Sequence, residues 1–271
     1  MLTRDGGRPM RIGVILPAAG QSKRFGGGDK LAQDLGGRAL LLRTVEALTK
    51  REEVVRIVVA GPPDDFEAFR EKFAATLGFH GATVVEGGRT ERWETVRNAL
   101  AAIDEDCTHI AVHDAARPGV SDDLLSRVFT AAKSLSAVVP AVPIAGTVKR
   151  GGKAETIGDA DDDVLADAIL GDAGRMTIEA RSVLETVDRA GLFEVQTPQV
   201  FEASLLRRAY EQSDLDGATD DAMLVERLGE PVYLVPGERR NLKVTTRDDL
   251  NLMRAILGVK PPAERPTHKR F

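Results

Sequence analysis

The sequence predicts an α/β protein in which helices cover both faces of a mainly parallel sheet. Two observations support this fold class. Short apolar or β-branched runs alternate with segments of helical periodicity through the first half of the 271 residues. Bare or charged turns follow several of these runs, at the strand ends where such sheets place their ligand sites. We expect strands at 12–16, 54–60, 82–86, 109–113 and 136–142, and helices at 38–50, 64–77, 90–103 and 121–133.

The second half of the chain is less regular. We expect an extended piece at 147–150 and then a loop rich in Gly and Asp at 151–163, whose acidic run indicates solvated carboxylates rather than a cation site. The later pattern predicts helices at 164–170, 176–187, 200–212, 218–228 and 247–257, and strands at 193–196, 232–235 and 241–245. We therefore expect a single domain at 10–258 and a flexible tail at 259–271.

Composition narrows the function classes. Hydrophobic residues make up 42% of the chain and charged residues 29%, which predicts a folded core. The net charge of -5 argues against a nucleic-acid partner, which would need a basic surface. Cys107 is the only cysteine, which excludes an internal disulfide and a cysteine metal cluster. Because no long apolar run and no signal peptide are seen, we expect no membrane partner and a cytoplasmic protein.

The stretch from residue 12 to residue 30 carries the strongest local signal. An apolar strand runs into a turn with almost no side chains, so its backbone N–H groups can approach an anion closely. Cations follow in a Gly-rich loop, which indicates phosphate binding, although a plain tight turn with solvated cations is the alternative. Neither standard phosphate-binding glycine motif is present. The residues are Pro17, Ala18, Ala19 and Gly20, followed by Lys23, Arg24 and Lys30.

Further candidates lie at later turns. Asp114 ends a predicted strand, where an aspartate commonly binds Mg²⁺ or a ligand hydroxyl, but it could equally cap the turn and pair with Arg117. His113 is expected to be packed rather than catalytic. Arg189 and Lys243 are by default solvated, since one lies in an irregular region and the other in a predicted strand. Nothing resembles a nucleophile–base pair, so the combination favours phosphoryl or nucleotidyl transfer by positioning and charge neutralisation.

A series of motifs then points to one family. The chain resembles the 2-C-methyl-D-erythritol 4-phosphate cytidylyltransferases of the non-mevalonate isoprenoid pathway from residue 11 to residue 257. The opening turn marks only the wider nucleotidyltransferase superfamily, whereas the later motifs are more specific. In chain order, the opening motif and the later ones are Pro17-Ala-Ala-Gly20 with Arg24 and Lys30, Val112-His-Asp-Ala-Ala-Arg-Pro118, Thr147 with Lys149-Arg150, Asp188-Arg-x-Gly-Leu192, Gln196-Thr-Pro-Gln199, Thr219-Asp-Asp221 and Asn241-Leu-Lys-Val-Thr245.

The resemblance implies that CTP and methylerythritol 4-phosphate, a polyol phosphate, give 4-diphosphocytidyl-2-C-methyl-D-erythritol and pyrophosphate, with Mg²⁺ as cofactor and Asp114 as its candidate ligand. By motif position, Arg24 and Lys30 would be catalytic and would stabilise charge on the α-phosphate. The residues implied for the nucleotide are Pro17, Ala18, Ala19, Gly20, Gly87, Gly88, Thr95, Asp114 and Ala115. The residues implied for the acceptor are Asp114, Arg117, Thr147, Arg189 and Lys243.

The same resemblance implies a Rossmann-like three-layer αβα nucleotidyltransferase fold, with a mixed sheet and a protruding dimerisation arm at about 143–191, and hence a homodimer. The chain departs from the family pattern at Ser22, at Asp29-Lys30-Leu31, and by one extra residue between Gly88 and Arg92. An insertion at 151–186 lengthens the arm and could alter the acceptor. The alternatives are therefore a ribitol-5-phosphate cytidylyltransferase and a non-catalytic nucleotide-binding homologue.

Overall fold

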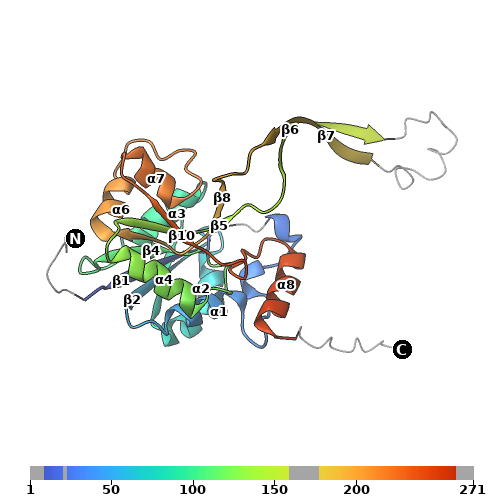
Figure 1. Ribbon diagram of the computed structural model, residues 1–271. Coiled ribbons are helices and arrows are strands. Elements are labelled where there is room, and N and C mark those ends of the chain that lie inside the picture. Colours follow the sequence, from blue (N-terminus) through green and yellow to red (C-terminus); the bar gives the residue numbers. More distant parts are fainter. Residues whose placement is uncertain (1–8, 21–22, 159–176, 261–271) are drawn as a thin grey trace, which may run out of the picture. The chain divides into compact units, whose positions relative to one another are not determined.

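The computed structural model describes residues 9–20, 23–158 and 177–260 (Figure 1). The chain divides into two compact units, which we treat separately. Unit 1 comprises Met1–Val142 and Val195–Phe271, and unit 2 comprises Pro143–Glu194. Some expectations lie outside the described residues. They are the acidic run at 159–163, the helix at 164–170 and all but two residues of the tail at 259–271.

Unit 1 is built on a mixed sheet with the strand order β10-β5-β9-β4-β1-β2-β3. Every neighbouring pair runs parallel except those of β9, which is antiparallel to both β4 and β5. The predicted mixed, mainly parallel sheet is thus confirmed. Its strands are β1 (Ile12–Pro17), β2 (Val54–Gly61), β3 (Ala82–Glu86), β4 (His109–Val112), β5 (Ala137–Pro143), β9 (Gln199–Glu202) and β10 (Tyr233–Pro236), and the short β8 (Phe193–Val195) precedes β9.

Helices cover both faces of this sheet because successive strand residues point to opposite faces, and the residues on each face are apolar. In β1, Val14 and Leu16 belong to one core cluster and Ile15 belongs to the other. The first cluster contains residues of α1 (Leu40–Leu48), α2 (Phe66–Phe79), α4 (Asp122–Ala132) and α8 (Arg247–Leu257). The second contains residues of α3 (Arg92–Leu100), α6 (Ala203–Tyr210) and α7 (Asp221–Arg227). The three-layer arrangement follows.

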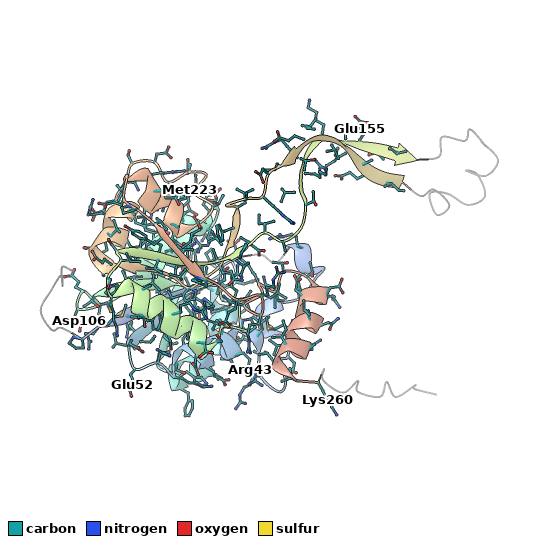
Figure 2. The ribbon with its side chains drawn as sticks, viewed as in Figure 1. Arg43, Glu52, Asp106, Glu155, Met223 and Lys260 are labelled. Carbon is teal, nitrogen blue, oxygen red and sulfur yellow. The ribbon has the colours of Figure 1, made fainter. Side chains whose placement is uncertain are left out.

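Local caps fix where these helices begin. Ser121 accepts a hydrogen bond from the N–H of Leu124 at the start of α4, as its sequence position predicts. Thr246 and Asp249 form a reciprocal capping box at the start of α8, and Gly258 ends that helix in the left-handed conformation. Figure 2 shows Glu52 and Asp106, two exposed charged side chains, at the outer edge of unit 1. Within the described ranges, no helix has the length and apolar character needed to cross a membrane.

The helix expected at 200–212 is wrong in its first part. Residues Gln199–Glu202 form β9, and the helix α6 begins only at Ala203. The short apolar pair Val200 and Phe201 suits either periodicity, so local pattern cannot decide it. Strand pairing fixes the extended state of these residues. Val200 lies opposite Ala111 of β4 and opposite Val138 of β5, and β9 completes the sheet between those two strands.

Unit 2 overturns two further expectations. Residues Thr177–Val187 form strand β7 rather than a helix, and residues up to 158 belong to strand β6 (Val148–Gly158) rather than to a loop. The two strands pair antiparallel, from Val148 opposite Val187 to Gly158 opposite Thr177, with two register shifts. β-branched residues such as Ile178 and Val183 favour this pairing, but the partner strand lies far away in sequence and the pattern alone did not reveal it.

Candidate active site

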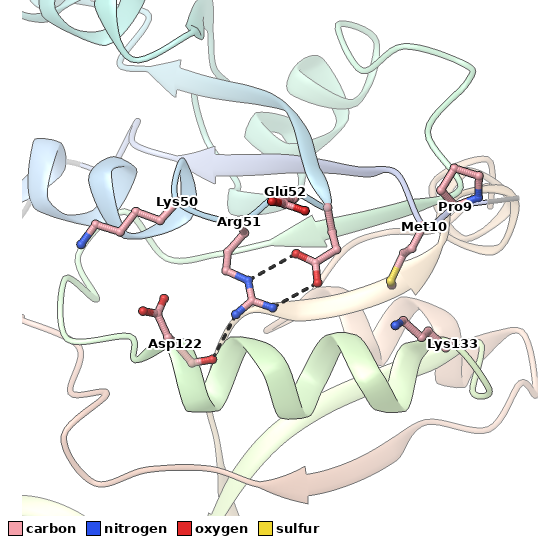
Figure 3. A pocket seen from close by; sticks show the side chains of 8 residues that line it. Pro9, Met10, Lys50, Arg51, Glu52, Asp122 and Lys133 are labelled. Atoms are coloured by element: carbon pink, nitrogen blue, oxygen red, sulfur yellow. Dashed lines mark hydrogen bonds and ion pairs between the residues drawn. The ribbon is translucent and has the colours of Figure 1, made fainter.

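Two clefts in the described part of unit 1 lie at opposite ends of its parallel strands. The first, of about 680 Å³, lies beside Met10, two residues before β1, and Glu53, which directly precedes β2 (Figure 3). Its central cation Arg51 is fully engaged: Nε and Nη2 donate to the Glu53 carboxylate at 3.3 and 3.1 Å, and Nη1 donates to the Asp122 carbonyl and to Ser126. The two central charged groups of this cleft, Arg51 and Glu53, are therefore paired with one another.

The second cleft, of about 870 Å³, lies at the carboxyl ends of the strands, where parallel sheets bind ligands. Pro17 ends β1, and Asp114 follows β4. Most of the predicted site residues line this cleft, although they come from widely separated parts of the chain. They are Pro17, Ala18, Ala19, Gly20, Lys30, Gly88, Thr95, Asp114, Ala115 and Lys243.

The remaining predicted residues do not line the cleft. Gly87 is buried behind its wall, and a Cβ there would meet Ala19 and Thr95 within 3.0 Å. Arg24 lies in the short 3₁₀ helix η1 (Lys23–Phe25) and is exposed. Arg117 is buried beneath the cleft. Thr147 and Arg189 belong to unit 2, where both are exposed and Arg189 donates a hydrogen bond to the carbonyl of Ala145.

Lys30 is held in place by the residue before it. Asp29 caps the 3₁₀ helix η2 (Lys30–Ala32) by accepting hydrogen bonds from the N–H groups of Leu31 and Ala32 at 3.0 and 3.3 Å. Lys72 of α2 donates to the other carboxylate oxygen of Asp29 at 2.9 Å. An aspartate at this position, a departure from the family pattern, therefore fixes the turn that presents Lys30 to the cleft.

The electrostatics of Lys30 show that cations converge on this cleft. Burial lowers the pKa of the Lys30 ammonium, and the positive charges of Lys243 and Arg24 lower it further. Arg24 therefore lies near enough to Lys30 to affect its charge, although its side chain does not line the cleft. A group of like charges held together in a protein without a ligand is costly, and a bound anion would relieve it.

Asp114 is the buried carboxylate at the centre of the cleft. Arg117 Nε donates to one of its oxygens at 2.9 Å, and Lys243 Nζ donates to the other at 3.0 Å. Burial opposes the ionisation of Asp114, but Lys243, Arg117 and Arg92 outweigh it and hold the pKa of this carboxyl well below its usual range. Asp114 is therefore an anion at every physiological pH. The predicted pairing with Arg117 is confirmed, and the predicted role of Asp114 in ligand binding stays a prediction that its place in the cleft supports.

The segment of Lys243 corrects another expectation. Residues 241–245 form no strand in the structure and follow the sheet as an irregular loop. The loop is fixed by polar contacts: Arg117 Nη1 donates to the Asn241 carbonyl at 2.7 Å, and Asn241 Nδ2 donates to the Thr197 carbonyl at 2.8 Å. The apolar alternation that suggested a strand serves instead to bury Val244. Lys243 consequently points at Asp114 instead of being solvated alone.

The Gly87-Gly88 turn is tied to helix α3. Gly88 N–H donates to Thr95 Oγ1 at 3.0 Å, and the side-chain amide of Asn98 donates to the Gly87 carbonyl at 3.0 Å. Thr95, expected to lie near the nucleotide, lines the cleft and at the same time holds this turn. Glu94 accepts three hydrogen bonds from Thr90 and Glu91, and so orders the part of the loop that contains the extra residue.

We predict that Gly88→Ala destabilises the protein by about 1–3 kcal/mol, the usual cost of overpacking. A Cβ at Gly88 would lie 2.2 Å from Glu94 Cβ and 2.8 Å from the backbone nitrogen of Thr95. Gly20→Ala is the matched control, because Gly20 lines the same cleft and a Cβ there meets nothing within 4 Å. Urea unfolding of both variants checks the prediction, and equal stabilities would contradict it.

His113 is a structural residue, as its sequence context suggested. It is fully buried, and its Nε2 lies 3.3 Å from the Arg117 carbonyl, which can only accept a hydrogen bond. We therefore assign the proton to Nε2, so that Nδ1 accepts from Thr197 Oγ1 at 3.0 Å and Thr197 accepts from the Asp114 N–H at 3.0 Å. This chain of hydrogen bonds positions the backbone of Asp114.

The buried imidazole predicts a pH dependence of stability. Burial lowers the pKa of His113 from 6.5 to about 4. Between these values the unfolded chain binds a proton that the folded chain does not, so stability is fully present above about pH 6.5 and falls as the pH drops toward 4. We expect about 2–3 kcal/mol to be lost between pH 7 and 4.5. Urea unfolding of wild type and His113→Gln checks this, and identical pH slopes would refute it.

Sequence reasoning missed three residues of this site. Asn98 donates to the backbone of the Gly87-Gly88 turn, and no motif marked it. Asp29 caps η2, and the sequence marked it only as a departure from the family pattern. Arg92 lines the cleft, and its Nη2 donates to Asp221 at 2.7 Å. Asp221 lies in the motif Thr219-Asp-Asp221, which the family resemblance marked without giving it a role. Pairing across 129 residues is the reason that neither partner could be paired from sequence.

A bare turn, clustered cations and one buried carboxylate at the carboxyl ends of a Rossmann-like sheet together define a nucleotidyltransferase. The comparisons agree and are more specific. The family model for IspD, 2-C-methyl-D-erythritol 4-phosphate cytidylyltransferase, matches residues 12–168 and 164–259, nearly the whole chain. The chain belongs to this family.

Individual relatives support the assignment. The 2-C-methyl-D-erythritol 4-phosphate cytidylyltransferase of Frankia casuarinae is 41% identical over 256 residues, which cover 94% of this chain and 84% of the relative. That of Bacteroides fragilis is 34% identical and covers 93% of this chain and 96% of the relative. Among solved structures, the Thermus thermophilus enzyme of the same name is 32% identical, with a TM-score of 0.68 and coverage of 92% of this chain and 100% of that one.

Proposed function

We propose that this chain transfers the cytidylyl group of CTP to the phosphate of 2-C-methyl-D-erythritol 4-phosphate, releasing pyrophosphate in the non-mevalonate isoprenoid pathway. The observation that carries the proposal is the convergence of Lys30, Lys243 and the bare turn at 17–20 on one cleft at the strand ends. Family membership supplies the identity of the two substrates.

The chemistry fits these residues. An oxygen of the acceptor phosphate attacks the α-phosphorus of CTP, the bond to the β-phosphate oxygen breaks, and its electron pair leaves with pyrophosphate. Because the attacking group is already an anion, no general base is required, which agrees with a neutral, fully engaged His113. Lys30, assisted by Arg24, neutralises the charge that builds on the α-phosphate. The N–H groups of Ala19 and Gly20 contact the nucleotide, whereas that of Ala18 donates to the Ala60 carbonyl at 2.8 Å. Lys243 with Arg117 holds the acceptor side.

Magnesium belongs to the same proposal. Within the described ranges no cluster of three His, Cys, Asp or Glu residues could hold a metal ion. Asp114 is the cleft's buried carboxylate, and each of its oxygens retains a lone pair beyond its bond to Arg117 or Lys243. This donor set fits Mg²⁺, which commonly takes one carboxylate and completes its shell with substrate phosphates and water. The ion would supply further charge neutralisation on the triphosphate.

A homodimer and a cytoplasmic location complete the proposal. Exposed apolar side chains of unit 2 support a partner for the hairpin, among them Ile157, Ile178 and Leu184. We propose that Thr147 and Arg189 act at the acceptor phosphate of the partner subunit. The single cysteine suits a reducing compartment. Light scattering on the purified protein at several concentrations tests the dimer.

The experiment that tests the function is release of pyrophosphate from CTP and Mg²⁺ with each acceptor offered separately. Release with methylerythritol 4-phosphate at a higher kcat/KM than with ribitol 5-phosphate is expected. Release with ribitol 5-phosphate alone would replace the acceptor while leaving the chemistry intact. No release with either acceptor, from protein that binds CTP by calorimetry, would identify a non-catalytic homologue and overturn the proposal.

A further inference from the structure

Arg92 begins helix α3 at the wall of the cleft. Its Nη2 donates to Asp221 Oδ2 at 2.7 Å. Among the described residues this is its only side-chain hydrogen bond, although a guanidinium has five N–H donors. The Asp221 side chain is 0% exposed, whereas that of Arg92 is 29% exposed. One edge of the guanidinium is therefore anchored in the interior, and donors remain available to a ligand in the cleft.

The Asp221 carboxylate, which holds Arg92, is itself fixed by hydrogen bonds from neighbouring elements. Tyr210, at the end of α6, donates its hydroxyl proton to the other oxygen of Asp221 at 2.5 Å. Burial and the Asp221 carboxylate raise the pKa of Tyr210, so this hydroxyl keeps its proton and remains a donor. Asp220 caps α7 and accepts a hydrogen bond from Gln199 of β9 at 2.7 Å, which fixes the start of the helix that carries Asp221. The motif at 219–221 thus fixes the carboxylate that positions Arg92.

A fully buried carboxylate that serves only to join two helices is a costly device, because an apolar pair would usually do as well. The cost is explained if the ion pair between Arg92 and Asp221 serves to orient the Arg92 guanidinium toward the cleft. Arg92 also lies close enough to lower the pKa of Asp114, so its field reaches the centre of the cleft. Arginine suits such a role since its planar fork binds phosphate through two parallel hydrogen bonds.

We propose that Arg92 binds a phosphate group of a substrate in this cleft and that Asp221, supported by Tyr210, is its positioning residue. The inference rests on the proposed function, which places two phosphate-bearing substrates here. The phosphate belongs either to the nucleotide or to the acceptor, and the experiment below separates the two sources.

The test measures CTP and methylerythritol 4-phosphate binding separately by calorimetry, both KM values, and melting temperature. Arg92→Gln should weaken one ligand about tenfold or more, the usual value of a charge-assisted contact. A higher Kd for CTP assigns the contact to the nucleotide, whereas a higher Kd or KM for the acceptor alone assigns it to the acceptor. Tyr210→Phe should shift the same constant by a smaller factor. Arg92→Lys keeps a positive charge opposite the buried Asp221 carboxylate, so this variant should remain folded even if Arg92→Gln does not.

Arg70→Gln is the matched control, because Arg70 forms an exposed pair with Glu67 and does not line the cleft. If Arg92→Gln and Arg92→Lys lower only the melting temperature, with both binding constants equal to those of the control, Arg92 is structural and the inference is overturned. Binding calorimetry requires no turnover. A protein that fails the pyrophosphate assay therefore refutes the proposed function, while the calorimetry still decides the role of Arg92.

Discussion

Lys30→Ala is expected to reduce kcat by about 10³-fold while weakening CTP binding by less than about tenfold. Negative charge on the α-phosphate oxygens grows as the acceptor oxygen approaches, and a fixed ammonium meets it only when it has developed. Several backbone N–H groups and other cations share the ground-state binding of the triphosphate. Steady-state kinetics combined with calorimetry on CTP separates the two effects. Equal losses in turnover and in binding would contradict the role assigned to Lys30.

Lys30→Arg is the companion variant because it preserves the charge. Burial and the neighbouring cations lower the pKa of Lys30 in the free enzyme, so wild-type kcat/KM should fall on the alkaline side before the ordinary lysine pKa is reached. Arginine keeps its proton throughout this range, and the alkaline limb should move to higher pH in Lys30→Arg. An unchanged limb would assign the titration to a group other than Lys30 and contradict the prediction.

The parts of the site that sequence predicted are those set by local chain geometry. The turn at 17–20 follows a buried strand, and Asp114 follows another, so parallel pairing of β1 with β4 brings them to one edge. This reasoning needs only the fold class and the strand ends. The same rule does not reach Arg92 or Asn98, whose roles depend on the helix that follows the Gly87-Gly88 turn.

The expectations that failed depended on distant partners. Residues 177–187 pair with β6, and 199–202 fill a gap between β4 and β5, so the strand state is decided by tertiary pairing rather than by their own periodicity. Residues 241–245 alternate like a strand, but Arg117 and Thr197 fix them as a loop through hydrogen bonds. Asp221 shows the same limit: its motif was visible, yet its partner Arg92 lies 129 residues away.

Asp114→Asn should be the most damaging single change to the described site in terms of stability. Removing one partner of a buried ion pair costs about 3–5 kcal/mol, because the remaining charges lose their compensation. Here the buried Arg117 and the half-buried Lys243 would both lose a carboxylate, and the new amide group would turn N–H donors toward cations. Turnover should fall as well, since Lys243 would lose the contact that orients it. Urea unfolding and pyrophosphate release measure the two losses.

Acid titration adds an independent check on Asp114. Its pKa lies below the ordinary value, so the charge contributes stability above about pH 4, and this contribution is lost as the pH falls below that point. Asp114→Asn should therefore flatten the acid limb of the stability curve relative to wild type. Asp106→Asn, which breaks an exposed pair with Arg11, should change stability by less than about 1 kcal/mol and leave the limb unaltered. If the two variants behave alike, the charges of the cleft are not coupled through Asp114, and the electrostatic basis of the proposed site fails.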